Sequence, residues 1–422
     1  TSSELTPGSQ PETSDPAALR RYTETYAYDA VGNLLTHQHV APGGNWTRHY
    51  VYATAGNRLL ETSAPGDPAA GPYSLDYEYD AHGNMTAMPH LAAIDWDALD
   101  RMQHADLGGG GDVYFQYDAA GNRVRKIRVN TAGTQTEERI YLGTLELYRE
   151  RTSGALQLER ETLHVADDIA RACMIETRTV TGGSPVTSPA NDARYQYGNH
   201  LGTVSLELDE AANTISYEEY HPYGTSAYRA VDSAITVSAK RYRYTGKERD
   251  EETGLDPMGA RYYAPWLGRW TAADPIGLGD GINRFAYVSG NPVGLQDPSG
   301  LRGAPTPLTA EQQAEVIHLV QQDVDAAGSG GLSRDVQLEL FERYAAQVRG
   351  EASPKQNRRP DVRSTERTAA EGIKAHSDRE AKLQAEKAEA FAVVTEAVKE
   401  SADKLLDGVQ SSLDTLGLIE GL

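Results

Sequence analysis

The sequence predicts a mainly β protein, with a curling antiparallel sheet over residues 22–300 and an all-α segment after it. Three observations predict this. A turn phrase with a leading aromatic residue recurs in the first 125 residues, short alternating runs continue to about residue 240, and after Leu301 the composition shifts to Ala, Glu, Gln, Lys and Leu. A phrase repeated every 17 to 27 residues indicates a repeat architecture, in which each hairpin buries its apolar face on the next.

Each phrase joins an aromatic residue to a tight turn. Asp follows the aromatic residue in four phrases and Gly-Asn closes four of them; they begin at Tyr28, Tyr52, Tyr79, Trp96 and Tyr117. An Asp side chain bonds its own turn backbone, and Gly-Asn readily adopts positive φ. We therefore expect β-hairpins whose aromatic rings pack between successive repeats.

The motifs between residues 241 and 301 are more specific than the turn phrases. They read RYRYTGKERD, GARYYAPWLGRW, ADPIG, GNPV and DPSGL, in segments 241–250, 259–270, 273–277, 290–293 and 297–301. This succession resembles the Rhs-associated core of the Rhs (rearrangement hot spot) family, and the turn phrase resembles its YD repeat. That family is related to the C component of insecticidal toxin complexes. One departure is Leu255-Asp256-Pro257-Met258, where the family usually has aromatic residues.

The resemblance implies a YD-repeat antiparallel β-sheet shell that forms part of a β-cocoon and encloses a variable effector. We expect this chain to be the C-terminal piece of a longer toxin protein. The predicted domains are a polar N-terminal segment (1–21), the YD-repeat sheet (22–240), the core closure (241–301) and a helical variable segment (302–422).

The resemblance also implies aspartyl-type self-cleavage after the DPSGL motif, between Leu301 and Arg302. This chemistry needs two carboxylates that share one proton. Asp297 is one candidate, and Asp274 is the other because it lies in the matching Asp-Pro pair. Arg261 matches a family position associated with cleavage, where a guanidinium can orient a carboxylate. On its own, an Asp-Pro pair is an ordinary turn initiator.

Two further residues are interpreted as structural. Asp280, in Gly-Asp-Gly, is a competing carboxylate that we interpret as a turn residue. His200, beside a Gly-Asn pair, is interpreted as a hydrogen-bonding residue at a turn.

Composition limits the other functions. The net charge of −21, from 40 basic and 61 acidic residues, argues against general affinity for nucleic acid or anionic membranes. The single cysteine, Cys173, excludes an internal disulfide and is expected to be a small buried side chain. No run of 18 apolar residues and no signal peptide are present. Residues 302–422 show no metal-ligand spacing, and we expect no metal or cofactor site in the chain.

Helical patterns dominate the C-terminal segment. A capping box at Thr309 opens one helix. Ser333 can cap a second helix that extends to Arg349, and a long Ala-, Glu- and Lys-rich helical pattern covers residues 368–416. Residues 302–422 contain no nucleophile-base pattern and no phosphate-binding loop. Two interpretations stay open: a helical effector that acts on a membrane or partner, and a non-toxic helical tail.

The leading hypothesis is therefore a self-processing carrier, a single-turnover aspartyl autoprotease whose cargo is its own C-terminal segment. The resemblance implies a role in interbacterial competition or toxin delivery. It also implies export by a dedicated secretion system, with a secretion apparatus, adaptor or immunity protein as partner. The competing hypothesis is a cell-surface YD-repeat module that binds carbohydrate or another ligand without proteolysis.

Overall fold

The computed structural model describes residues 21–166, 171–231, 238–305 and 334–348, with residues 312, 315, 316, 318–320 and 322 of a further helix. The chain divides into two compact units, Thr1–Ala352 and Ser353–Leu422. The second unit, the predicted N-terminal segment and the helical pattern over 368–416 lie outside the described residues.

The described part is mainly β, and its strands pair antiparallel, as predicted. A first sheet has the order β1-β2-β3-β4-β5. Its strands are β1 (Thr23–Tyr28), β2 (Leu34–Val40), β3 (Trp46–Tyr52), β4 (Leu59–Thr62) and β5 (Leu75–Asp76). A hairpin of β6 (Glu78–Tyr79) and β7 (Met85–Ala87) follows it.

The second sheet, which we call the wall, has 13 strands in the order β20-β19-β18-β17-β15-β14-β13-β12-β11-β10-β9-β8, with β16 paired to β15. Its strands are β8 (Ala93–Trp96), β9 (Met102–Asp106), β10 (Asp112–Tyr117), β11 (Arg123–Val129), β12 (Gln135–Leu142), β13 (Leu145–Thr152), β14 (Ala155–Ala166), β15 (Arg171–Thr181), β16 (Ser184–Pro185), β17 (Asn191–Gly198), β18 (Val204–Leu208), β19 (Thr214–Tyr220) and β20 (Ser226–Val231). Consecutive strands are neighbours almost throughout, as a chain of hairpins requires.

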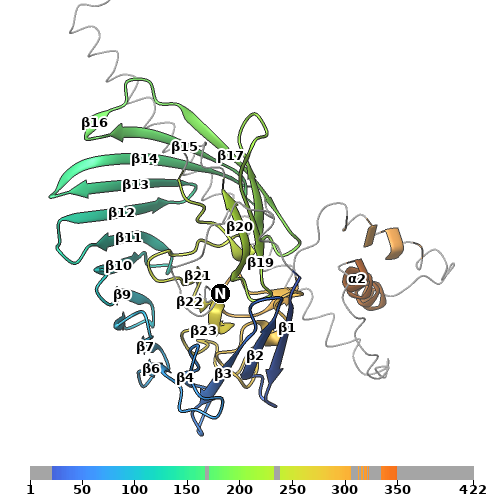
Figure 1. Cartoon of the computed structure of the whole chain (residues 1–422). Coiled ribbons are helices and arrows are strands. Elements are labelled where there is room, and N and C mark those ends of the chain that lie inside the picture. The colour runs from blue at the N-terminus through green and yellow to red at the C-terminus, as the bar shows by residue number, and fades with distance from the viewer. Residues whose placement is uncertain are drawn as a thin grey trace, which may run out of the picture. The chain divides into compact units, whose positions relative to one another are not determined.

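The core closure lies on the concave side of the wall (Figure 1). It contains a small sheet of β21 (Asp256–Met258), β22 (Arg261–Ala264) and β23 (Arg269–Trp270), and a pair of β24 (Leu295–Gln296) and β25 (Ala304–Pro305). Short 3-10 turns cover Tyr244–Gly246, Pro265–Leu267 and Val288–Gly290.

The turn phrases adopt one repeated geometry. In the first phrase, Asp29 Oδ1 accepts hydrogen bonds from the backbone of Val31 and Asn33, at 3.0 and 2.8 Å, and Asn33 Nδ2 donates to Asp29 Oδ2. The same Asp–Asn pairing closes the turns at 80–84 and 118–122. It also closes a turn at 209–213, which sequence reasoning missed although the Asp and Asn spacing is the same.

In every phrase after the first, the leading aromatic residue hydrogen-bonds to the preceding repeat. Tyr52 Oη donates to the carbonyl of Leu34 at 2.9 Å, and Tyr117 Oη donates to that of Met102 at 2.7 Å. In the degenerate phrase, Trp96 Nε1 takes the same role. The rings therefore tie successive hairpins together, as predicted, and each polar atom finds a partner while the ring stays partly buried.

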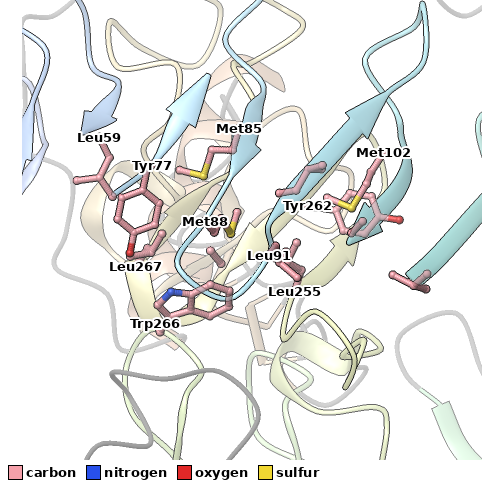
Figure 2. Close-up of a cluster of buried hydrophobic side chains, with 14 of the residues drawn as sticks. Leu59, Tyr77, Met85, Met88, Leu91, Met102, Leu255, Tyr262, Trp266 and Leu267 are labelled. Atoms are coloured by element: carbon pink, nitrogen blue, oxygen red, sulfur yellow. The ribbon is translucent and has the colours of Figure 1, made fainter. Parts of the chain in front are cut away.

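An apolar core joins the first strands to the closure (Figure 2). Side chains from the repeat strands contribute one side of this cluster, and closure residues contribute the other; the labelled members are Leu59, Tyr77, Met85, Met88, Leu91, Met102, Leu255, Tyr262, Trp266 and Leu267. Arg48 Nη1 donates to the carbonyl of Trp266 at 2.7 Å inside this region. The closure is thus packed as part of the same hydrophobic core as the repeats.

Buried ion pairs attach the closure to the middle of the wall. Asp250 is fully buried and contacts Arg123 Nη1 at 2.6 Å and Lys126 Nζ at 2.8 Å. Arg241 likewise contacts Glu146 at 2.7 Å. Since buried charges need partners, these pairs fix where the closure sits on strands that are far away in sequence.

After the closure, α2 (Arg334–Val348) confirms the helix predicted from Ser333 to Arg349. Residues 312, 315, 316, 318–320 and 322 are also helical, and Val316 packs with Ala345 of α2. No helix in these described residues is long and apolar enough to cross a membrane.

Candidate cleavage site

The structure brings together the three residues predicted for cleavage. Arg261 begins β22, Asp274 follows β23, and Asp297 follows β24. Arg261 Nη2 lies 3.0 Å from Asp274 Oδ2 and 3.4 Å from Asp297 Oδ2. All three residues are buried, with exposed fractions of 1 to 3%. One guanidinium therefore contacts both candidate carboxylates away from solvent.

Arg261 also contacts the chain next to the predicted cleavage bond. Its Nε donates to the carbonyl of Gly300 at 2.5 Å, and its Nη1 donates to that of Arg284 at 3.2 Å. The guanidinium lies 4.1 Å from the centre of the Trp270 ring. Because the guanidinium is planar and its donors are fixed, these contacts set its orientation.

The glycine of the DPSGL motif is required by a close approach of two backbones. Gly300 has φ of +68°, and a Cβ added there would lie 2.2 Å from the carbonyl oxygen of Met258. Next to it, Ala260 N donates to the Ser299 carbonyl at 2.9 Å. Only glycine combines this φ with this contact at no steric cost. The motif is therefore held directly against the turn that precedes Arg261.

Asp297 lies beside the leucine that precedes the predicted bond. Its Oδ1 accepts hydrogen bonds from Leu301 N at 3.2 Å and from Ser299 Oγ at 2.9 Å. Asp274 Oδ1 similarly accepts from Ile276 N at 2.9 Å. Both aspartates therefore also build turns, as the Asp-Pro pairs indicate on their own, and their Oδ2 atoms face the same arginine.

The two carboxylates have different environments. Burial raises the pKa of Asp274, and the nearby carboxylates of Asp280 and Asp297 add to this, although the Ile276 amide and Arg261 oppose it. A carboxyl group whose pKa is raised keeps its proton to higher pH, which suits Asp274 to the role of proton donor.

Asp280 has a contact that sequence reasoning missed. It lies in a turn, as predicted, but its Oδ2 also accepts from Gly303 N at 3.2 Å, and its Oδ1 lies 3.9 Å from Arg302 Nε. Arg302 Nη2 also donates to the Gly279 carbonyl. The segment 279–280 thus holds the chain after the predicted bond. The Gly-Asp-Gly sequence alone contains no signal for this contact.

The other structural interpretations are consistent with their surroundings. His200 Nε2 donates to the Val293 carbonyl at 2.8 Å, so it links a turn of the wall to the closure. Cys173 is buried in β15, and burial raises the pKa of its thiol.

Known proteins resemble both the sequence and this fold. No family model matches the chain. Toxin subunit YenC2 of Yersinia entomophaga is 32% identical over 300 residues, which are 69% of this chain and 30% of that protein. Double-stranded DNA deaminase toxin A of Burkholderia cenocepacia is 28% identical over 303 residues, 68% of this chain and 20% of that protein.

A crystal structure of TcdB2-TccC3 without its hypervariable C-terminal region has a TM-score of 0.57 and 34% identity, over 66% of this chain and 13% of that one. This chain is an Rhs-like, YD-repeat protein. It is related to the C component of insecticidal toxin complexes, so the sequence resemblance is confirmed. As an Rhs-like chain it spans about 30% of the length of YenC2, and its relatives are toxins of more than one kind.

Proposed function

We propose that this Rhs-like chain is the closing part of a carrier, which encloses the segment after Leu301 and frees it by one cut between Leu301 and Arg302. The observation that carries the proposal is the position of Arg261, whose guanidinium contacts Asp274, Asp297 and the Gly300 carbonyl together. A turn alone does not need two buried carboxylates on one cation beside the predicted bond.

The contacts suggest a division of roles. Asp297, which accepts hydrogen bonds from Ser299 and Leu301, is the ionised carboxylate that takes a proton from the attacking water. Asp274, whose pKa is raised, keeps its proton and donates it to the carbonyl oxygen of Leu301. Water adds to the carbonyl carbon, the C–N bond breaks, and the amine of Arg302 leaves with a proton. Leu301 then ends in a carboxylate.

The proposed cargo is residues 302–422, and the proposed setting is interbacterial competition or toxin delivery after secretion. Support comes from relatives whose names describe different toxins, a toxin subunit and a DNA deaminase, and which each match about two thirds of this chain. A common shell with different enclosed segments accounts for that pattern. A delivery complex, an adaptor or an immunity protein would be the partner.

Intact mass spectrometry of the purified chain tests the cut. We expect the wild type to yield two fragments that separate between Leu301 and Arg302, whereas Asp274→Asn and Asp297→Asn should each stay whole. Proton transfer by a positioned side chain contributes about 10²–10⁴-fold to a rate, so either loss should leave the chain uncut for hours. Far-UV circular dichroism should show the same β content in all three proteins.

Asp280→Asn is the matched control, since it removes a nearby carboxylate that contacts the chain after the bond. We expect it to slow the cut much less than Asp274→Asn or Asp297→Asn does. If Asp280→Asn stays whole while Asp274→Asn is cut, the second carboxylate has been assigned wrongly.

The role of Asp274 predicts how cleavage depends on pH. Its pKa is raised, chiefly by burial, so the proton it must donate is present at low pH and is lost as the pH rises through that raised pKa. Uncut chain from a short cell-free synthesis should therefore be cut more slowly as the buffer moves from about pH 5 to pH 8. A rate that climbs across this range would contradict the assignment of Asp274 as the proton donor.

A further inference from the structure

A second cluster of ionisable side chains lies where the first strands meet the last hairpin of the wall. Glu24 of β1, His37 and His39 of β2, and His221 of the turn between β19 and β20 converge there. Glu24 Oε1 lies 2.8 Å from His221 Nδ1, 3.1 Å from His39 Nδ1 and 3.5 Å from His37 Nε2. The four side chains are 4 to 9% exposed.

Strand geometry explains why these residues meet. His37 and His39 are two apart on β2, so they share one face of the strand, and Glu24 pairs with His39 across the β1–β2 ladder. His221 comes from nearly 200 residues further along the chain. The Tyr28 and Tyr223 hydroxyls, 2.6 Å apart, join the same two regions. The cluster therefore lies at a junction between the first sheet and the end of the wall.

Hydrogen bonds alone do not satisfy this cluster. Three imidazole nitrogens face one carboxylate oxygen, which has two lone pairs. The other oxygen of Glu24 already accepts from Tyr26 Oη at 2.5 Å. His37 Nε2 is buried and has no hydrogen-bond partner. A buried nitrogen that lies 3.5 Å from a carboxylate oxygen without a hydrogen bond is unfavourable unless something binds between them.

The spacing suits a transition-metal ion. In a tetrahedral zinc site with bonds of about 2.0–2.1 Å, ligand atoms are roughly 3.3 Å apart. The observed distances to Glu24 Oε1 lie on both sides of this value, and the ligand atoms of Glu24, His39 and His221 all lie within 4.8 Å of one another. Imidazole nitrogen with one carboxylate oxygen is a donor set that suits zinc.

The surroundings hold the ligands in place. Tyr26 stacks on His37 with ring centres 4.4 Å apart, and Trp46 and Tyr22 stack on His39 at 5.4 and 5.2 Å. A carboxylate held beside imidazoles in fixed orientations is prepared to bind a cation.

We propose that Glu24, His39 and His221, completed by His37, form a structural binding site for a divalent transition metal of the zinc type. Four protein ligands fill a tetrahedral shell and leave no open position for substrate, so the site is structural rather than catalytic. The bound ion ties the β1–β2 hairpin to the β19–β20 turn and so stabilises the junction between the two sheets.

Elemental analysis of tag-free protein, purified without chelator, tests the proposal. We expect close to one zinc per wild-type chain, and a Co²⁺-exchanged sample with the intense visible absorption of tetrahedral cobalt. The double variant His39→Gln, His221→Gln should bind no metal above background. Losing a supporting contact costs about 10–100-fold in metal affinity, so losing two ligands should exceed that.

His200→Gln is the control, since this exposed histidine lies outside the cluster and donates a hydrogen bond to the Val293 carbonyl. It should keep full metal content. In the wild type and in His200→Gln, added Zn²⁺ should raise the melting temperature of chelator-treated protein, and in the double variant it should not. Metal-free wild-type protein that neither binds Zn²⁺ nor develops the cobalt spectrum would overturn the proposal without reference to any variant. Equal zinc content in the double variant and the wild type would overturn it as well.

Discussion

Replacing Asp250 by Asn is expected to lower the free energy of unfolding by about 3–5 kcal/mol, which is the cost of breaking a buried ion pair from one side. Asp250 is fully buried and contacts Arg123 and Lys126 at 2.6 and 2.8 Å. Its loss leaves two cations in the interior with less compensating charge. Neither cation can reach solvent without separating the closure from strand β11, because both are almost fully buried.

Urea unfolding followed by tryptophan fluorescence measures this loss. Asp76→Asn is the matched control, since Asp76 is exposed in β5 and its substitution should change stability by less than about 0.5 kcal/mol. Adding Lys126→Met to Asp250→Asn should recover part of the loss, because it removes one of the two cations that have lost Asp250 as a partner. If Asp250→Asn unfolds with the wild-type midpoint, the ion pairs do not hold the closure to the wall.

The same ion pairs mark the limit of what the sequence could predict about the fold. The turn at Asp29 and Asn33 closes through contacts within four residues, so its chemistry was readable from the phrase itself. The turn at 209–213 uses the same spacing and was readable by the same rule. Asp250 meets Arg123 across 127 residues, and no local pattern specifies which buried charge will pair with which.

The two candidate sites differ for the same reason. Asp274, Asp297 and Arg261 were named because the motif order resembles a family, and the structure brings them to one place. The alternation of His37 and His39 is visible in the sequence. Glu24, however, is placed beside them only by the register of β1 on β2, and His221 only by the way the wall curves back toward the first sheet. A site assembled from both ends of a long sheet needs the fold before it can be recognised.

Replacing Arg261 by Met is expected to slow self-cleavage by about 10²–10³-fold, the size of effect seen when one preorganised donor is removed from a reacting centre. Met fills a similar volume but leaves Asp274 and Asp297 without their shared cation and the Gly300 carbonyl without its donor. The fraction of cut chain, followed by intact mass after cell-free synthesis, gives the rate.

Arg261→Lys separates charge from geometry. An ammonium neutralises the carboxylates, but it lacks the planar fork that reaches both aspartates and the Gly300 carbonyl at once. We therefore expect Arg261→Lys to cleave well below the wild-type rate, although faster than Arg261→Met, with the pH dependence displaced because the pKa of Asp274 has changed.

Arg269→Lys is the control. It alters a buried arginine on the adjacent strand β23, which donates to the Asn57 carbonyl. Since Arg269 has no contact with the DPSGL motif among the described residues, its cleavage should stay close to normal. Full activity in Arg261→Lys would show that Arg261 supplies charge alone, and that the position of the Gly300 carbonyl is set by the glycine turn without it.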